Sequence, residues 1–373
     1  MKLTFKIAWR NLWRHKGKSM TVGVILFIGA LIMTVGNGMI SGLEKGFSEN
    51  IVNLFTGDIV IISDEQDRDD VLYEFTGKPL SGIKNYDALR ELLKADKNIQ
   101  SFLPATIGTV MVLDPNSEME DMVLLGVDIA EYQKVFPDSF QVIKGDILYP
   151  GETGLLLSDY TRQACFENMG FWLLPENSEL DPEELPAYAH NSIDNLDLRS
   201  DIVFMGASYS NTMMDVRVPV KGIIKYKSLN KLWGRYSIVD IESFRQAHNY
   251  ITGADSMVEL SQEEEELLSY EEFDQLFGLE DIIDQSMVTD QTLSIQDIRM
   301  KTEKSEKEYS TDKGSYNVVL VKLKRGSSPI DVLENLNTIF KENQISARAI
   351  SWKQAMGPFG SMAVMIKAAL DIF

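Results

Sequence analysis

The stretch from Ser19 to Ile40 contains no charged side chain. A helix of this length rises roughly 33 Å, which is enough to cross a hydrocarbon core of about 30 Å. Its glycines are common in membrane helices and unfavourable in soluble ones. A cleaved signal peptide would have a shorter apolar region, of about 7–15 residues, and an Ala-x-Ala-like site. We therefore expect an uncleaved transmembrane helix over residues 19–55, whose outer end continues as a stalk.

The residues before this span form an amphipathic pattern. Trp9 and Trp13 recur on one helical face, and the cations Arg10 and Arg14 lie on an adjacent stripe. Tryptophans on an apolar face beside a cationic stripe are typical of a helix lying in the membrane interface. We expect residues 1–18 to form this helix on the cytoplasmic side, because basic residues stay in the cytoplasm.

The charge of the chain is unevenly distributed. The formal net charge is −20, yet residues 1–43 contain six basic side chains and no acidic one. The remaining 30 basic residues stand against 56 acidic ones, which gives the rest of the chain a net charge of about −26. A nucleic-acid binder needs a basic surface, so that class is excluded. The asymmetry suggests that the two parts lie on opposite sides of a membrane, with the large domain extracytoplasmic.

Two strand–helix–strand patterns occur far apart in the body of the chain. Each combines alternating strands with one amphipathic helix, and caps are expected at Asn85 and Ser328. The first pattern has strands at Asp58–Ser63 and Ile99–Leu113, and the second has strands at Tyr316–Lys324 and Ile345–Ser351. We expect one α+β domain of βαβ units, made of residues 56–170 and 314–356, that carries an inserted domain.

Residues 171–313 are expected to form the inserted, β-rich subdomain. Its acidic segment, 255–297, contains no basic residue. We interpret this segment as a solvated lobe; a docking surface for a basic partner is the alternative. A divalent-cation loop is less favoured, because the alternating Asp/Asn–Gly ligand spacing is missing. After this domain, residues 357–373 resume an apolar helical pattern and are expected to begin a second interfacial or membrane helix.

The sequence contains no recognisable catalytic constellation. His15, His190 and His248 have no histidine four residues away, and Cys165 has no neighbouring thiol. Gly17–Ser19 resembles the end of a phosphate-binding loop, but its first glycine is replaced by Leu12. We expect no catalytic residue, no cofactor and no metal site, and therefore no enzymatic activity of this chain.

Gly38, Gly42 and Gly46 are spaced by four and lie along one ridge if the first helix continues past Ile40. A glycine ridge lets another helix approach closely. We expect a helix-packing site here, either within the same protein or against a second copy. A packing ridge carries no chemistry.

The run Ala8–Lys16, followed by a glycine-rich span, resembles the opening of FtsX/MacB/LolC-type ABC-transporter permeases, which begin "A-x-R-N-L-x-R". Later segments are similar in order, including Gly126-Val127-Asp128, Gly154–Ser158 and Val220–Ile223. The resemblance implies a four-span, dimeric permease of the bacterial inner (cytoplasmic) membrane, which has a porter-like extracytoplasmic domain and works with a separate or fused ABC ATPase. It also implies mechanotransmission to the extracytoplasmic domain, with lipoprotein release favoured among the family's export functions. A homodimer and a heterodimer remain alternatives, as does contact with a lipoprotein or periplasmic partner.

A rival interpretation is a single-span, membrane-anchored sensor or binding module with no transport role. Such a protein would have the same N-terminal anchor and outer domain. The two interpretations differ in whether three further spans follow residue 373.

Overall fold

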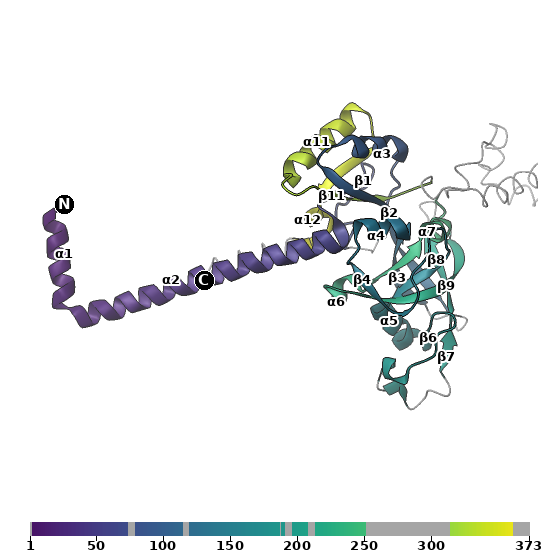
Figure 1. Cartoon of the computed structure of the whole chain (residues 1–373), viewed down its shortest axis with the longest axis horizontal. Coiled ribbons are helices and arrows are strands. Elements are labelled where there is room, and N and C mark those ends of the chain that lie inside the picture. Colours follow the sequence, from purple (N-terminus) through teal and green to yellow (C-terminus); the bar gives the residue numbers. More distant parts are fainter. Residues whose placement is uncertain are drawn as a thin grey trace, which may run out of the picture. The chain divides into compact units, whose positions relative to one another are not determined.

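The computed structural model describes residues 2–73, 79–114, 119–186, 188–190, 196–207, 213–250 and 314–360 (Figure 1). Its residues divide into two units, one made of Met1–Ile51 with Pro358–Phe373, and the other of Val52–Gly357. The acidic segment 255–297 lies outside the described residues, and so do residues 361–373 of the expected second helix.

The first unit is helical at its N-terminal end. Helix α1 covers Lys2–Arg14, and α2 covers Lys16–Ile51, so the expected interfacial segment 1–18 is interrupted at His15. Among the described residues, Lys16–Gly36 is the one helical segment long and apolar enough to cross a membrane, judged by length and composition. The hydroxyls of Thr21 and Thr34 donate back to backbone carbonyls at 3.0 and 2.8 Å. These bonds satisfy polar groups that lipid could not.

The second unit, Val52–Gly357, is an α+β fold, as expected. Its principal strands are β1 (Ile59–Ser63), β2 (Ile99–Leu113), β3 (Met119–Val127), β4 (Phe140–Gly145), β5 (Leu155–Ser158), β8 (Asp201–Ala207), β9 (Met213–Tyr226), β10 (Tyr236–Asp240), β11 (Val318–Leu323) and β12 (Ala347–Ser351). Its principal helices are η1 (Val52–Thr56), α3 (Tyr86–Ala95), α4 (Ile129–Val135), α5 (Asp159–Met169), α6 (Asn230–Trp233), α7 (Ile241–Ala247), α11 (Pro329–Glu342) and α12 (Trp352–Ala355). A short parallel pair, β6 (Phe171–Leu173) and β7 (Asp197–Arg199), and a 3-10 turn, η2 (Pro182–Glu184), lie outside the main sheet.

The main sheet runs β12-β1-β11-β2-β3-β10-β5-β9-β4, and β8 joins β2 to β9. Strand β2 links its two halves: residues 99–105 pair with β11, and residues 106–113 pair with β3. The expected joining of distant strands is confirmed, because Ile61 pairs with Val319 in antiparallel register.

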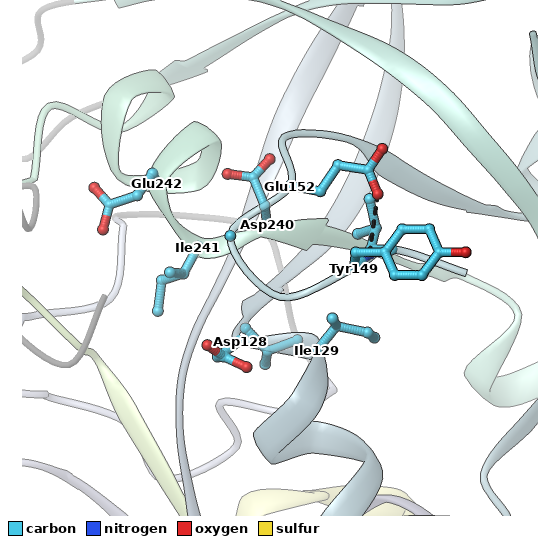
Figure 2. A pocket seen from close by; sticks show the side chains of 10 residues that line it. Asp128, Ile129, Tyr149, Glu152, Asp240, Ile241 and Glu242 are labelled. Carbon is cyan, nitrogen blue, oxygen red and sulfur yellow. Dashed lines mark hydrogen bonds between the residues drawn. The ribbon is translucent and has the colours of Figure 1, made fainter. Parts of the chain in front are cut away.

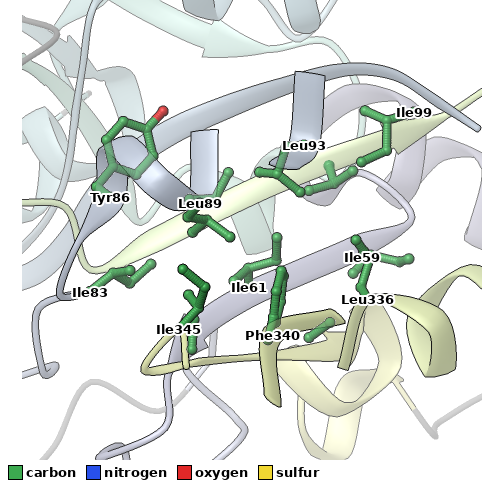
Figure 3. Close-up of a cluster of buried hydrophobic side chains, with 14 of the residues drawn as sticks. Ile59, Ile61, Ile83, Tyr86, Leu89, Leu93, Ile99, Leu336, Phe340 and Ile345 are labelled. Atoms are coloured by element: carbon green, nitrogen blue, oxygen red, sulfur yellow. The ribbon is translucent and has the colours of Figure 1, made fainter. Parts of the chain in front are cut away.

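Helices α3 and α11 cover the first half of the sheet and bury one core with it (Figure 3). The residues Val332, Leu336 and Phe340 recur every four positions, so one face of α11 packs inward. Ser328 accepts a hydrogen bond from the Asp331 backbone N–H, which confirms the expected cap. Burying each such large apolar side chain contributes about 1.5–3 kcal/mol.

Asn85 stands at the expected cap position of α3, but the expected side-chain capping bond does not form. Asn85 adopts the left-handed conformation (φ 56°), and its side chain makes no capping bond. The Asn85 carbonyl instead accepts from the N–H groups of Ala88 and Leu89 at 3.1 and 3.3 Å. Asparagine is one of the few residues with a side chain that tolerate this conformation. The backbone conformation, and not a capping bond from the side-chain amide, therefore explains why asparagine stands here.

A second core lies under the other half of the sheet. It joins Val110 and Leu124 to Cys165, Phe204 and Phe244. This core therefore draws on residues before and after position 171. The domain boundaries expected at 56–170, 171–313 and 314–356 remain predictions.

Candidate functional site

The most distinctive local structure of the second unit lies where its chain begins. The π-helical turn η1 directly precedes Gly57 and β1, and it buries the side chain of Phe55, which is 1% exposed. The Phe55 ring stacks on Trp233 of α6, with ring centroids 3.9 Å apart and planes inclined by 15°. A residue 178 positions away in the sequence therefore holds the first turn of the unit.

Two tyrosines complete this cluster, which we call the Phe55 junction: Phe55, Tyr226, Trp233 and Tyr236. Tyr236 and Tyr226 lie 4.9 and 6.0 Å from the Phe55 ring. The Tyr226 hydroxyl donates to the Tyr236 carbonyl at 3.2 Å, and the Tyr236 hydroxyl donates to the Leu72 carbonyl at 2.6 Å. Burial raises the pKa of both phenols well above its usual range, so both stay neutral donors.

Gly57 fixes the step from η1 into β1. Its φ is +70°, and a Cβ added there would lie 2.5 Å from the Val321 carbonyl oxygen. The next residue, Asp58, donates its N–H to that same oxygen at 2.8 Å. Only glycine allows the chain to turn this close to β11 in this conformation.

Lys322 of β11 connects the same turn to a second element. Its ammonium donates to the carbonyls of Asn53 in η1 and Val135 at the end of α4, both at 2.8 Å. Burial lowers the pKa of Lys322, and the charge of Asp58 opposes that shift. Burial raises the pKa of Asp58, and the Leu323 N–H and Lys322 oppose that shift. Opposite charges thus offset each other's desolvation at the start of the unit.

The chain leaves the unit beside the place where it enters. Strand β12 pairs antiparallel with β1, so Ser351 lies opposite Ile59. A capping box between Ser351 and Gln354 then starts α12, and the unit ends at Gly357. A domain whose first and last strands are neighbours can be inserted between two consecutive helices of a larger fold.

A small cavity lies elsewhere, beside four carboxylates: Asp128, Glu152, Asp240 and Glu242 (Figure 2). Its volume of about 20 Å³ is room for roughly one water molecule. Asp128 and Asp240 cap α4 and α7, and burial raises the pKa of Asp240. Glu152 pairs with Lys221 and Glu242 with Arg245. These four carboxylates therefore have structural roles, as helix caps or in ion pairs. Among the described residues, no group of three or more His, Cys, Asp or Glu is placed to hold a metal ion.

His248 and Cys165 are buried core residues. The two ring nitrogens of His248 lie 3.2 and 3.3 Å from the carbonyls of Phe244 and Thr109, and burial lowers its pKa. Burial raises the pKa of the Cys165 thiol to about 12. Neither side chain is poised for nucleophilic or metal chemistry.

The residues predicted to contact membrane lie on α1. Trp9 and Trp13 are 57% and 66% exposed, and Arg10 and Arg14 are also exposed. Phe5 stacks on Trp9, with ring centroids 6.4 Å apart, so two aromatic rings lie together on α1. The arrangement suits an interfacial helix, whose role stays a prediction.

The predicted glycine ridge lies on one continuous helix, because α2 runs unbroken past Gly38, Gly42 and Gly46. At each of these glycines, an added Cβ would meet no described atom within 4 Å. The ridge therefore has room for a neighbouring helix, and its role as a packing site stays a prediction.

No protein-family model matches the chain, and no curated protein matches its sequence. In structure, the chain is similar to the periplasmic region of MacB from Actinobacillus actinomycetemcomitans. That match has a TM-score of 0.36 and 10% identity, and it covers 87% of this chain and 96% of the other. The chain is also similar to the extracellular domain of the ABC-type transporter YknZ from Gram-positive bacteria. Here the TM-score is 0.34 with 10% identity, and the coverage is 79% and 99%.

Proposed function

We propose that this chain is a permease subunit of an ABC transporter of the mechanotransmission type. The observation that carries the proposal is the pairing of β1 with β12, which brings the first and last strands of the Val52–Gly357 unit side by side. Such a unit can sit between two membrane helices and respond to their movement. The N-terminal sequence motif Ala8–Lys16 supports the same assignment.

In this proposal the basic N-terminus lies in the cytoplasm, α2 crosses the inner membrane, and the acidic unit lies outside. The interfacial helix α1 supplies the cationic end that stays inside. A partner ABC ATPase provides the energy, and the chain itself performs no catalysis. Two permease copies, or two paralogues, form the membrane part.

The Phe55 junction supports the mechanical part of the proposal. The turn η1 is joined to β11, α4 and α6 through Phe55, Gly57 and Lys322. Together these elements connect η1 to both halves of the sheet. A displacement of η1 is therefore transmitted to the sheet, because no loose linker separates the two. Lipoprotein release is the work we favour, and export of another hydrophobic or peptide cargo is the next alternative.

The glycine ridge provides a test. At Gly42 an added Cβ meets no described atom within 4 Å, so we expect Gly42→Leu to be tolerated by α2 itself. Against a close partner helix, overpacking should cost about 1–3 kcal/mol. We expect transport by the complete protein with its ATPase to fall more than membrane abundance does. Transport should be measured per permease molecule.

Gly29→Leu is the matched control, because Gly29 lies in the same apolar helix on roughly the opposite side and has the same free space. It should leave transport unchanged. Normal transport by Gly42→Leu at normal abundance would show that the glycine ridge has no role in transport. A membrane-anchored sensor would show no ATP-dependent transport in either case.

A further inference from the structure

Two methionines lie opposite each other on the outer face of the second half of the sheet. Met111 of β2 pairs directly with Met205 of β8. Met111 also lies directly opposite Asp121 of β3, and Met205 lies directly opposite Asp215 of β9. Four neighbouring strands therefore carry one row, Asp121–Met111–Met205–Asp215, which we call the methionine row (strands in Figure 1).

The row faces away from the second core. The flanking residues Val110 and Val112 are buried in that core, and side chains alternate between the two faces of a strand. Met111 is 40% exposed, Met205 is half-buried, and both aspartates are exposed. A further methionine, Met119, lies two positions from Asp121 on the same face and is 58% exposed.

The spacing lets the sulfurs of Met111 and Met205 meet. Residues directly opposite in a sheet have Cβ atoms about 4.5–5.5 Å apart, and diagonal neighbours lie about 7–8 Å apart, within reach of long side chains. The methionine side chain is unbranched and has three rotatable bonds. The sulfurs of Met111 and Met205 can therefore approach one ion from both sides, and Met119 is a diagonal neighbour of Met111 on β3.

We infer that the methionine row is a binding site for a soft monovalent cation of the Cu(I) or Ag(I) type. Thioether sulfur selects such ions, whereas Mg²⁺ and Ca²⁺ prefer oxygen ligands. The carboxylates at both ends supply negative charge beside uncharged sulfurs. On the same face, Arg217 pairs with Asp201 at 3.9 Å. The inference does not depend on the proposed transport function.

The test is a titration of the full chain, in detergent, with Ag(I), which shares the charge and thioether preference of Cu(I) and is stable in air. The chain has 17 methionines, so their ε-methyl groups are followed by NMR after ¹³C labelling. We expect the methyl signals of Met111 and Met205 to shift first and together. The double variant Met111→Leu/Met205→Leu should lose this binding step.

Met214→Leu is the matched control. Met214 is 46% exposed and adjoins Asp215, but it lies on the opposite face of β9. Leucine and methionine are close in volume, so both variants should stay folded. A second variant, Asp121→Asn/Asp215→Asn, keeps the sulfurs and should bind Ag(I) more weakly. Unchanged binding by the methionine double variant, or methyl shifts spread evenly over all methionines, would overturn the inference.

Discussion

Replacing Phe55 by alanine should lower the free energy of unfolding of the Val52–Gly357 unit by about 3–5 kcal/mol. The side chain is 1% exposed and stacks on Trp233, so its removal leaves a cavity and also forfeits aromatic stacking. Chemical denaturation followed by tryptophan fluorescence measures the loss. Transport per folded molecule should fall further than stability alone explains, because the junction joins η1 to the sheet.

Phe340→Ala is the control for Phe55→Ala. Phe340 is equally buried, but it lies in the first core on α11, away from the Phe55 junction. Phe340→Ala should lower the free energy of unfolding by a similar amount, but transport per folded molecule should be retained. Phe55→Leu keeps part of the volume and loses the stacking, which covers the case in which the alanine variant fails to fold. Equal transport by the Phe55 and Phe340 variants would contradict the role of the junction.

Gly57→Ala should be the second most damaging substitution. A left-handed conformation costs a side-chain-bearing residue on the order of 1–3 kcal/mol. At Gly57 the new Cβ would also lie 2.5 Å from the backbone oxygen of Val321, which cannot move without disturbing β11. We expect the start of β1 to lose its bond from Asp58 to Val321. Hydrogen exchange at the Asp58 amide should therefore become faster.

Gly170→Ala separates conformational strain from collision. Gly170 has φ +79° at the end of α5, but no atom of the described residues lies within 4 Å of an added Cβ. It should show only the conformational cost and leave Asp58 exchange unchanged. If Gly57→Ala is no worse than Gly170→Ala, the close approach to Val321 does not constrain the junction.

The regular elements of the second unit could be predicted because their patterns are local. The strand predicted at 99–113 has those bounds in the structure. The Pro329 start of α11 follows from a serine cap with proline at the first helical position. The joining of the two strand–helix–strand patterns in one sheet could also be predicted, and the pairing of β1 with β11 confirms it.

The Phe55 junction could not be predicted in the same way. Phe55 follows a polar, helix-like stretch, and its sequence context resembles the end of a stalk. Its partners Trp233 and Tyr236 belong to segments almost 180 residues later, and no local period links them. The sequence pattern predicts only that Lys322 is a polar position of an alternating strand. In the structure, its ammonium donates hydrogen bonds to two backbone carbonyls. Long-range contacts of this kind depend on tertiary packing.

The most direct test of the account is the membrane topology of two single-cysteine substitutions, labelled with an impermeant maleimide in intact spheroplasts. Ile330→Cys lies on α11 and is exposed, and Lys6→Cys lies on the polar face of α1. The native Cys165 is buried, and its pKa is raised to about 12, so it should not react. The account predicts labelling of Ile330→Cys in intact spheroplasts and of Lys6→Cys only after lysis. Labelling of Lys6→Cys in intact spheroplasts, with Ile330→Cys protected until lysis, would contradict it.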